Sequence, residues 1–311
     1  MMRKSHVAGA AFLSATMALS TTFNVHAGTT YKAPERETLH TFLNDNEQVK
    51  RQDFTGIGKL FIDDGDNTNE CTAVVLGRHL LVTSKHCLQD QPSDYANYNV
   101  NADYYDDAHF YFMPRYGTHA GTITELPIGN NGPIGKPYRN VYAPHHDDFH
   151  LATNDFHGAT RNIKGLDFFT PFSAKSSIDI AFIKLPKGLP RGIKPLDVAD
   201  ISDTNMMFNA YTAGYADAAG PDNKQDGTLT ITNAPCIVQD NQRHQLISPC
   251  RIYPGDSGGP VFDIRDGNIH VIAINNLYDE NNIHRNSGVI LQGLTGFCRR
   301  KLGPGHCMSF P

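Results

Sequence analysis

The sequence predicts an all-β protein, and three observations support that prediction. The chain contains 27 glycines and 10% aromatic residues, together with many Thr, Val, Ile and Tyr, a composition that favours strands joined by turns. Its apolar residues occur in short runs bounded by Gly, Pro, Asn and Asp, as is typical of strands. Long stretches with a helical repeat of 3.6 residues are scarce.

Length and charge limit the class further. At 311 residues the chain exceeds the usual size of one domain, yet β-barrel proteins often pass about 200 residues as a single unit. Its net charge of −5 and pI of about 6.3 arise from mixed rather than clustered charges, so we expect no nucleic-acid partner.

Residues 1–27 have the features of a secretory signal peptide. Basic residues precede an apolar stretch from Val7 to Phe23, and Val25-His26-Ala27 fits a small-x-small cleavage site. Serines and threonines interrupt the apolar stretch, which makes it a poor membrane span, and no later segment is long enough to cross a bilayer. We therefore expect a secreted protein, extracellular or periplasmic.

The six cysteines suit such an oxidising compartment. Six cysteines allow fifteen pairings, which sequence alone does not decide, but their clustering favours three local disulfides. No CxxC or other zinc spacing occurs, so we expect disulfides rather than a metal site. The favoured pairs are Cys71-Cys87, Cys236-Cys250 and Cys298-Cys307.

Strand-like segments begin near residue 54. Residues 28–53 are polar, weakly periodic and end near the dibasic pair Lys50-Arg51, so they form either a propeptide or an N-terminal arm. Segments 56–62, 71–76 and 80–83 then predict strands, and the last of them leads directly into Ser84-Lys85-His86-Cys87.

Three motifs in this order resemble the trypsin/chymotrypsin-like serine proteases. They are Leu81-Val82-Thr83-Ser84-Lys85-His86-Cys87, Asp179-Ile180-Ala181-Phe182-Ile183-Lys184-Leu185 and Gly255-Asp256-Ser257-Gly258-Gly259-Pro260. The resemblance runs from about residue 54 to 297 and is nearest in texture to bacterial-type secreted members. It implies two packed six-stranded Greek-key β-barrels, the first at 54–190 and the second at 191–311 with a C-terminal extension.

The resemblance also implies a catalytic triad of His86, Asp179 and Ser257. A serine hydroxyl is a poor nucleophile at neutral pH, and an imidazole can take its proton during attack and return it to the leaving amine. The carboxylate would orient the imidazole. The backbone N–H groups of Gly255 and Ser257 would form the oxyanion hole, because glycine lets its amide turn inward without a side-chain clash.

About 90 residues separate His86 from Asp179, roughly twice the family's usual interval, so we expect a long insertion at about 90–175. Strand-like pieces at 109–113 and 121–124 indicate barrel strands that carry long loops. The run His145-His146-Asp147-Asp148-Phe149-His150 could bind a metal, but adjacent loop residues rarely converge on one ion, so we expect a solvated loop.

The second half shows more strand patterns and one helix. A Pro/Gly/Lys stretch at 186–195 suits a link between halves, and strands are expected at 207–215, 227–232, 269–276 and 288–291. A short terminal helix is expected at 295–302, before Gly303-Pro304.

The serine loop also fits G-x-S-x-G, the nucleophile elbow of α/β-hydrolases. That fold requires a helix after the serine, whereas Pro260-Val261-Phe262-Asp263-Ile264 predicts a strand. It also requires the order Ser, Asp, His, for which only the last 54 residues remain. An esterase of that class is therefore disfavoured.

Activation and specificity are less determined. In family members made as zymogens, a new N-terminal ammonium pairs with the equivalent of Asp256, but no Ile/Val-Val-Gly-Gly sequence occurs here, and cleavage after Arg51 would expose Gln52. The partner of Asp256 therefore stays open. The resemblance places Arg251, Asn275 and Asn276 at the substrate pocket. Arg251 either favours acidic side chains or faces solvent, and Asn275 tells against glutamate specificity because such relatives have His there.

These observations together predict a secreted serine endopeptidase that hydrolyses peptide bonds through an acyl-enzyme. It would act on protein or peptide substrates as a monomer, with no cofactor, no bound metal and no membrane span. The alternative is a protease-fold binding or adhesive module that lacks catalysis, although such modules usually lose a triad residue.

Overall fold

The computed structural model describes the barrel strands, the N-terminal arm and the C-terminal extension of the chain. The described residues are 33–63, 68–88, 109–114, 124–125, 140–142, 178–185, 188–189, 191–201, 207–216, 228–240, 245–277 and 286–311. The expected signal peptide at 1–27, most of the expected insertion at 90–175 and the histidine-rich run at 145–150 lie outside them. Within the described residues, no helix has the length and apolar character needed to span a bilayer.

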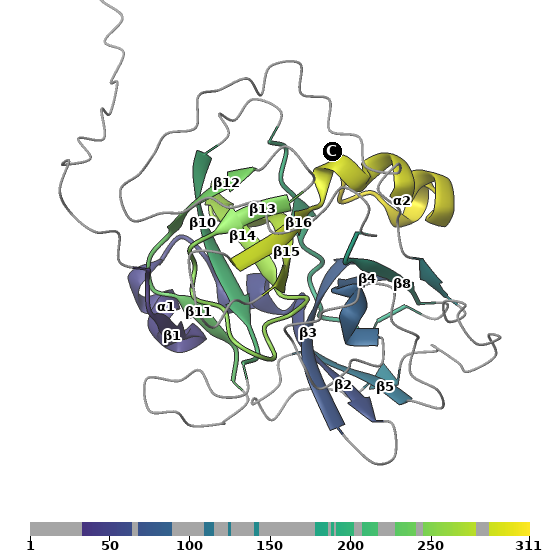
Figure 1. Cartoon of the computed structure of the whole chain (residues 1–311), viewed down its shortest axis with the longest axis horizontal. Helices are drawn as coiled ribbons and strands as arrows, with labels where there is room; N and C mark the ends of the chain where they lie inside the picture. Colours follow the sequence, from purple (N-terminus) through teal and green to yellow (C-terminus); the bar gives the residue numbers. More distant parts are fainter. Residues whose placement is uncertain are drawn as a thin grey trace, which may run out of the picture.

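The all-β prediction is confirmed, and the strands form two sheets that lie side by side (Figure 1). The first sheet has seven strands in the order β6-β5-β2-β3-β4-β8-β7, and all its pairings are antiparallel. Its strands are β2 Ile57–Asp63, β3 Thr68–Gly77, β4 Leu80–Thr83, β5 His109–Pro114, β6 Thr124–Glu125, β7 Val141–Tyr142 and β8 Ala181–Lys184.

The second sheet has nine strands, and its hydrogen-bonded path closes on itself. Six strands make a ring, β10-β12-β13-β16-β15-β14, because β14 pairs back to β10 through Tyr211↔Phe262 and Thr212↔Val261. This ring is a six-stranded barrel, as expected. The ring strands are β10 Met207–Gly214, β12 Cys236–Asp240, β13 Gln245–Ser248, β14 Pro260–Arg265, β15 Asn268–Leu277 and β16 Asn286–Ile290, and the additional strands are β1 Arg36–Thr38, β9 Asp197–Val198 and β11 Thr230–Thr232.

Alternation along β3 explains how the first sheet is buried on both faces. Ala73 and Val75 pack into a core inside the first sheet, whereas Val74 and Leu76 pack into a larger core that also contains Phe262 of the second sheet. Successive side chains of a strand point to opposite faces, so an uninterrupted apolar run such as Val74-Val75-Leu76 is what a strand covered on both sides requires.

The N-terminal segment of residues 33–50, here called the arm, packs on the second sheet (Figure 1). Strand β1 pairs with β11, and helix α1, Leu39–Asp45, follows at once. The hydroxyl of Thr38 accepts a hydrogen bond from the Thr41 N–H and so caps this helix. On its inner face the ring of Phe42 is fully buried and makes edge contacts with Phe54 and Tyr211. The polar composition of residues 28–53 did not predict this helix.

The C-terminal extension packs against the first sheet. It contains the expected helix α2, Thr295–Leu302, flanked by short 3-10 turns η6, Gln292–Leu294, and η7, Pro304–His306. The disulfide Cys298–Cys307 closes the extension on itself. The rings of Phe297 and Phe310 pack against Phe182 of β8, which anchors the extension beside the strand that follows Asp179.

Candidate active site

His86 lies in a 3-10 turn that follows β4. This turn, η2, spans Lys85–Leu88, and the disulfide Cys71–Cys87 ties it to β3; the two cysteines are 16 positions apart in the sequence. All three disulfides of the structure join the pairs favoured by the sequence. The disulfide at Cys87 therefore restrains the position of the residue next to it, His86.

Asp179 reaches His86 because β4 and β8 are paired neighbours. Thr83 lies opposite Ala181, so the residues just after β4 lie beside the residues just before β8. The Asp179 Oδ1 atom accepts from the His86 backbone N–H at 2.9 Å, and Oδ2 lies 2.9 Å from Nδ1. Asp179 is only 5% exposed, so water barely reaches the carboxylate that holds both the backbone and the ring of His86.

This contact determines which ring nitrogen is available. When Nδ1 donates to Asp179, the neutral imidazole of His86 keeps Nε2 as its proton acceptor. The neighbouring Lys85 is also buried, and burial lowers its pKa while the charge of Asp179 opposes that shift. His86 and Asp179 are thus arranged as a base and the carboxylate that orients it.

Ser257 lies in the loop between residues 253 and 260, just before β14. Gly255 and Gly258 adopt φ angles of +90° and +84°, which glycine tolerates and residues with a Cβ rarely do. The loop is fixed to β15 because the Gly258 N–H donates to the Asn275 carbonyl at 2.7 Å and the Asn275 N–H donates to the Gly259 carbonyl at 2.8 Å. The strand that follows, β14, rules out the helix that an α/β-hydrolase elbow needs.

The first sheet holds the same loop from the other side. The Thr72 N–H donates to the Ser257 carbonyl at 2.8 Å, and the Thr72 hydroxyl donates to the Gly255 carbonyl at 2.8 Å while accepting from the Tyr215 N–H at 3.0 Å. A Cβ at position 258 would collide with the Thr72 carbonyl and the Thr83 hydroxyl. The serine loop is therefore packed directly against the strands that carry His86.

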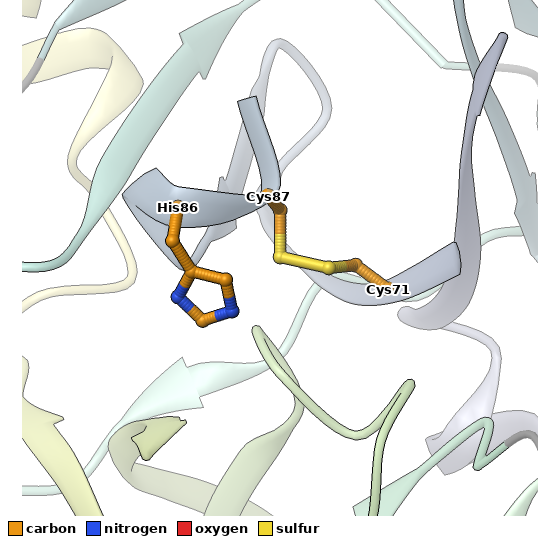
Figure 2. Close-up of side chains that lie close together, drawn as sticks. All are labelled: Cys71, His86 and Cys87. Carbon is orange, nitrogen blue, oxygen red and sulfur yellow. A yellow bond between two sulfur atoms is a disulfide. The ribbon is translucent and has the colours of Figure 1, made fainter. Parts of the chain in front are cut away.

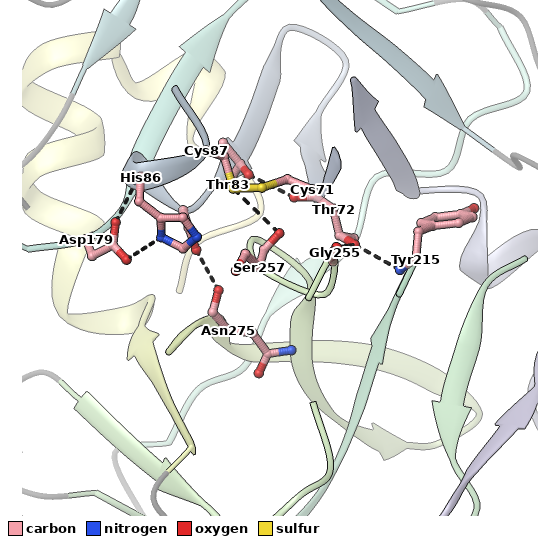
Figure 3. The surroundings of a disulfide bond; sticks show 11 residues. Cys71, Thr72, Thr83, His86, Cys87, Asp179, Tyr215, Gly255, Ser257 and Asn275 are labelled. Atoms are coloured by element: carbon pink, nitrogen blue, oxygen red, sulfur yellow. Dashed lines mark hydrogen bonds and ion pairs between the residues drawn. A yellow bond between two sulfur atoms is a disulfide. The ribbon is translucent and has the colours of Figure 1, made fainter. Parts of the chain in front are cut away.

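These contacts bring the three expected triad residues together. Figure 3 shows the His86 ring between the Asp179 carboxylate and the loop of Ser257, and the Ser257 carbonyl lies 3.8 Å from the sulfur of Cys87. Among the described residues, the N–H groups of Gly255 and Ser257 have no acceptor, so both can donate to a ligand. The arrangement offers a nucleophile, an oriented base and two N–H donors.

One group of possible metal ligands lies beside the site. Figure 2 shows His86 next to the sulfur atoms of Cys71 and Cys87, with ligand atoms within 4.8 Å of one another. The two sulfurs are joined in a disulfide, so neither can supply the thiolate that a metal requires. We therefore assign no metal to this group.

Asp256, whose partner the sequence left open, contacts Arg36 of the arm. The Arg36 guanidinium lies 3.1 Å from Asp256 Oδ1, and both side chains are buried. Neither this contact nor those of Thr72 was predicted from the sequence. A polar residue at position 72, within a buried apolar strand, is the one signal that could have indicated the role of Thr72.

The three residues expected at the substrate pocket have protein partners. Arg251 forms an ion pair with Glu35 of the arm at 2.8 Å. The Asn275 side chain is buried and donates to the Thr212 hydroxyl at 2.5 Å, and the buried Asn276 side chain accepts from Ser287 at 3.0 Å. Their assignment to a substrate pocket stays a prediction.

Comparisons with known proteins place this geometry in a family. The solved structure of a Glu endopeptidase in complex with MPD matches with a TM-score of 0.50 and 14% identity, over 84% of this chain and 92% of that chain. At that identity the likeness concerns the fold. No curated protein matches the sequence. The family model described as a trypsin-like peptidase domain matches residues 71–274, about two thirds of the chain. The protein therefore belongs to the trypsin/chymotrypsin-like serine protease family.

Proposed function

We propose that the protein is a secreted serine endopeptidase with the triad His86, Asp179 and Ser257. The observation that carries this proposal is the pair of 2.9 Å contacts from Asp179 to His86, beside a serine loop with two available N–H donors. The three disulfides support a location outside the cytosol, together with the signal-peptide features of residues 1–27.

The first half of the reaction forms an acyl-enzyme. The Ser257 Oγ attacks the peptide carbonyl carbon while His86 Nε2 takes the hydroxyl proton. The carbonyl oxygen becomes an oxyanion, which the Gly255 and Ser257 N–H groups stabilise; one such donor is worth about 3 to 4 kcal/mol. His86 then gives the proton to the leaving amine as the C–N bond breaks.

The second half repeats these steps with water. His86 Nε2 takes a proton from water, whose oxygen attacks the acyl carbon, and the same proton returns to Ser257 Oγ as the ester bond breaks. Asp179 stabilises the imidazolium formed in each half because its buried carboxylate faces Nδ1. The residues need no cofactor for these steps.

Among the residues that the structure describes, the side chains near the expected pocket do not support the acidic preference that the name of the Glu endopeptidase implies. Arg251 is the cation expected near the pocket, but its guanidinium already pairs with Glu35. We therefore propose the reaction class and leave the preferred residue to cleavage profiling with a peptide library.

The test is covalent labelling by a fluorophosphonate, which reacts with activated serines. We expect one adduct on the wild-type chain and none on Ser257→Ala. The variant's circular dichroism spectrum and three disulfides provide the folding control. A folded wild-type chain that neither labels nor cleaves any peptide of the library would favour the noncatalytic binding module instead.

A further inference from the structure

Asp256 places a carboxyl group in the buried part of the serine loop, where its negative charge requires a compensating partner. It is fully buried, and burial raises the pKa of its carboxyl, a shift that Arg36 and the Tyr253 N–H oppose. Its Oδ2 atom accepts from the Tyr253 N–H at 2.9 Å and its Oδ1 atom faces Arg36 at 3.1 Å. Gly214 leaves the room for this carboxylate, because a Cβ there would collide with Oδ1.

The position of Asp256 controls the two donors of the oxyanion hole. The Ser257 N–H belongs to the peptide that follows Asp256, and the Gly255 N–H lies in the turn that the Asp256 side chain closes by accepting from the Tyr253 N–H. Its backbone is also tied into the loop, since its N–H donates to the Tyr253 carbonyl at 3.0 Å and its carbonyl accepts from the Gly259 N–H at 2.8 Å. Displacement of the Asp256 carboxylate from its buried site would therefore also displace the N–H groups of Gly255 and Ser257.

Arg36 has a built site of its own. Its guanidinium donates to the Thr230 hydroxyl at 2.9 Å, to the Thr230 carbonyl at 2.7 Å and to the Arg251 carbonyl at 3.2 Å, in addition to Asp256. The planar fork of arginine suits several acceptors in fixed directions. It thus links β11, the segment just before the serine loop and the carboxylate of Asp256.

The arm that carries Arg36 is firmly held. Strand β1 pairs Arg36 with Thr232 and Thr38 with Thr230, and the Asn233 N–H donates to the Glu35 carbonyl at 2.9 Å. Beyond β1, Phe42 is fully buried in the large core. Removal of residues 33–51 would therefore delete a strand, empty a core position and leave Asp256 buried without its cation.

We propose that Arg36 is the positioning residue for the oxyanion hole and replaces the new N-terminal ammonium on which zymogen-type relatives depend. The arm is then a permanent part of the mature enzyme rather than a propeptide, and the chain is active without a cut at Lys50-Arg51. This inference rests on the proposed serine peptidase function.

The test compares fluorophosphonate labelling rates of the full chain and four variants. We expect Arg36→Met to lower the second-order labelling rate by about 100-fold, the loss typical for an oxyanion donor. Arg36→Lys keeps the charge and should recover part of that loss. Asp256→Asn combined with Arg36→Met removes the unpaired charge as well as its partner, so the double variant should be no slower than Arg36→Met alone. Arg265→Met is the matched control. Arg265 also pairs with an aspartate, Asp263, at 2.6 Å, but this pair lies outside the serine loop, so the variant should label at the wild-type rate.

A second measurement decides the matter even if Arg36→Met does not fold. The intact mass of the labelled wild-type chain, measured under denaturing conditions, should correspond to a chain that still contains residue 36. Labelling confined to chains that begin after Arg36, for example at Gln52, would overturn the proposal, as would an unchanged rate in a folded Arg36→Met. Failure of the wild type itself to label at Ser257 would instead remove the proposed function.

Discussion

His86 and Ser257 are held in place in two different ways. His86 is fixed within the first sheet, by the paired strands β4 and β8, the carboxylate of Asp179 and a disulfide to β3. The Ser257 loop is fixed from three separate parts of the chain, by Thr72 of β3, by Asn275 of β15 and by Arg36, which lies 220 positions from Asp256. The position of the base therefore depends on contacts within the first sheet, whereas the positions of the nucleophile and its oxyanion donors depend on the assembly of both sheets and the arm.

The largest effect is expected from a change in the contact between Asp179 and His86. Asp179→Asn keeps the size of the side chain but replaces an acceptor facing Nδ1, so the ring can adopt the wrong tautomer. We expect kcat to fall by about 10⁴-fold. Steady-state hydrolysis of a peptide substrate measures this loss.

The matched control for that change is Asp53→Asn. Asp53 is also buried and accepts from a backbone N–H, that of Lys50, at 2.8 Å and from the Lys194 ammonium at 2.6 Å. Its replacement should lower stability and leave kcat nearly unchanged. Equal losses of kcat in the two variants would show that Asp179 acts through folding rather than through His86.

A smaller effect is expected where the first sheet holds the serine loop. Thr72→Val preserves shape but leaves the Gly255 carbonyl and the Tyr215 N–H without their partner, at a cost of about 1 to 3 kcal/mol. Because the lost hydrogen bond to the Gly255 carbonyl holds the serine loop in position, we expect the labelling rate of Ser257 to fall by roughly 10- to 100-fold.

Thr55→Val is the control for the Thr72 variant. The Thr55 hydroxyl likewise donates to a carbonyl, that of Gln52, and accepts a backbone N–H, that of Lys194, both at 2.8 Å. Thermal unfolding should show similar destabilisation in both variants, whereas only Thr72→Val should label slowly. A Thr72 variant that labels like the wild type would mean that Asn275 and Arg36 hold the loop without help from the first sheet.

The same contrast explains how much the sequence could predict. His86, Asp179 and Ser257 lie in short motifs that a single reading along the chain detects, and the strands around them are short apolar runs. Arg36 could not be assigned because its partner depends on the register between β1 and β11, which no local pattern in the polar segment 28–53 specifies. Arg251 was expected near substrate, yet the arm brings Glu35 to it. Helix α1 did leave one signal, the capping residue Thr38 before Leu39.

The most direct test of the central claim is the pre-steady-state reaction of the uncut chain with a peptide nitrophenyl ester. We expect a burst of about one nitrophenol per chain, followed by slower turnover, and peptide mapping of the quenched enzyme should locate the acyl group on Ser257. A folded chain with its three disulfides formed that shows neither a burst nor an acyl group on Ser257 would contradict that claim.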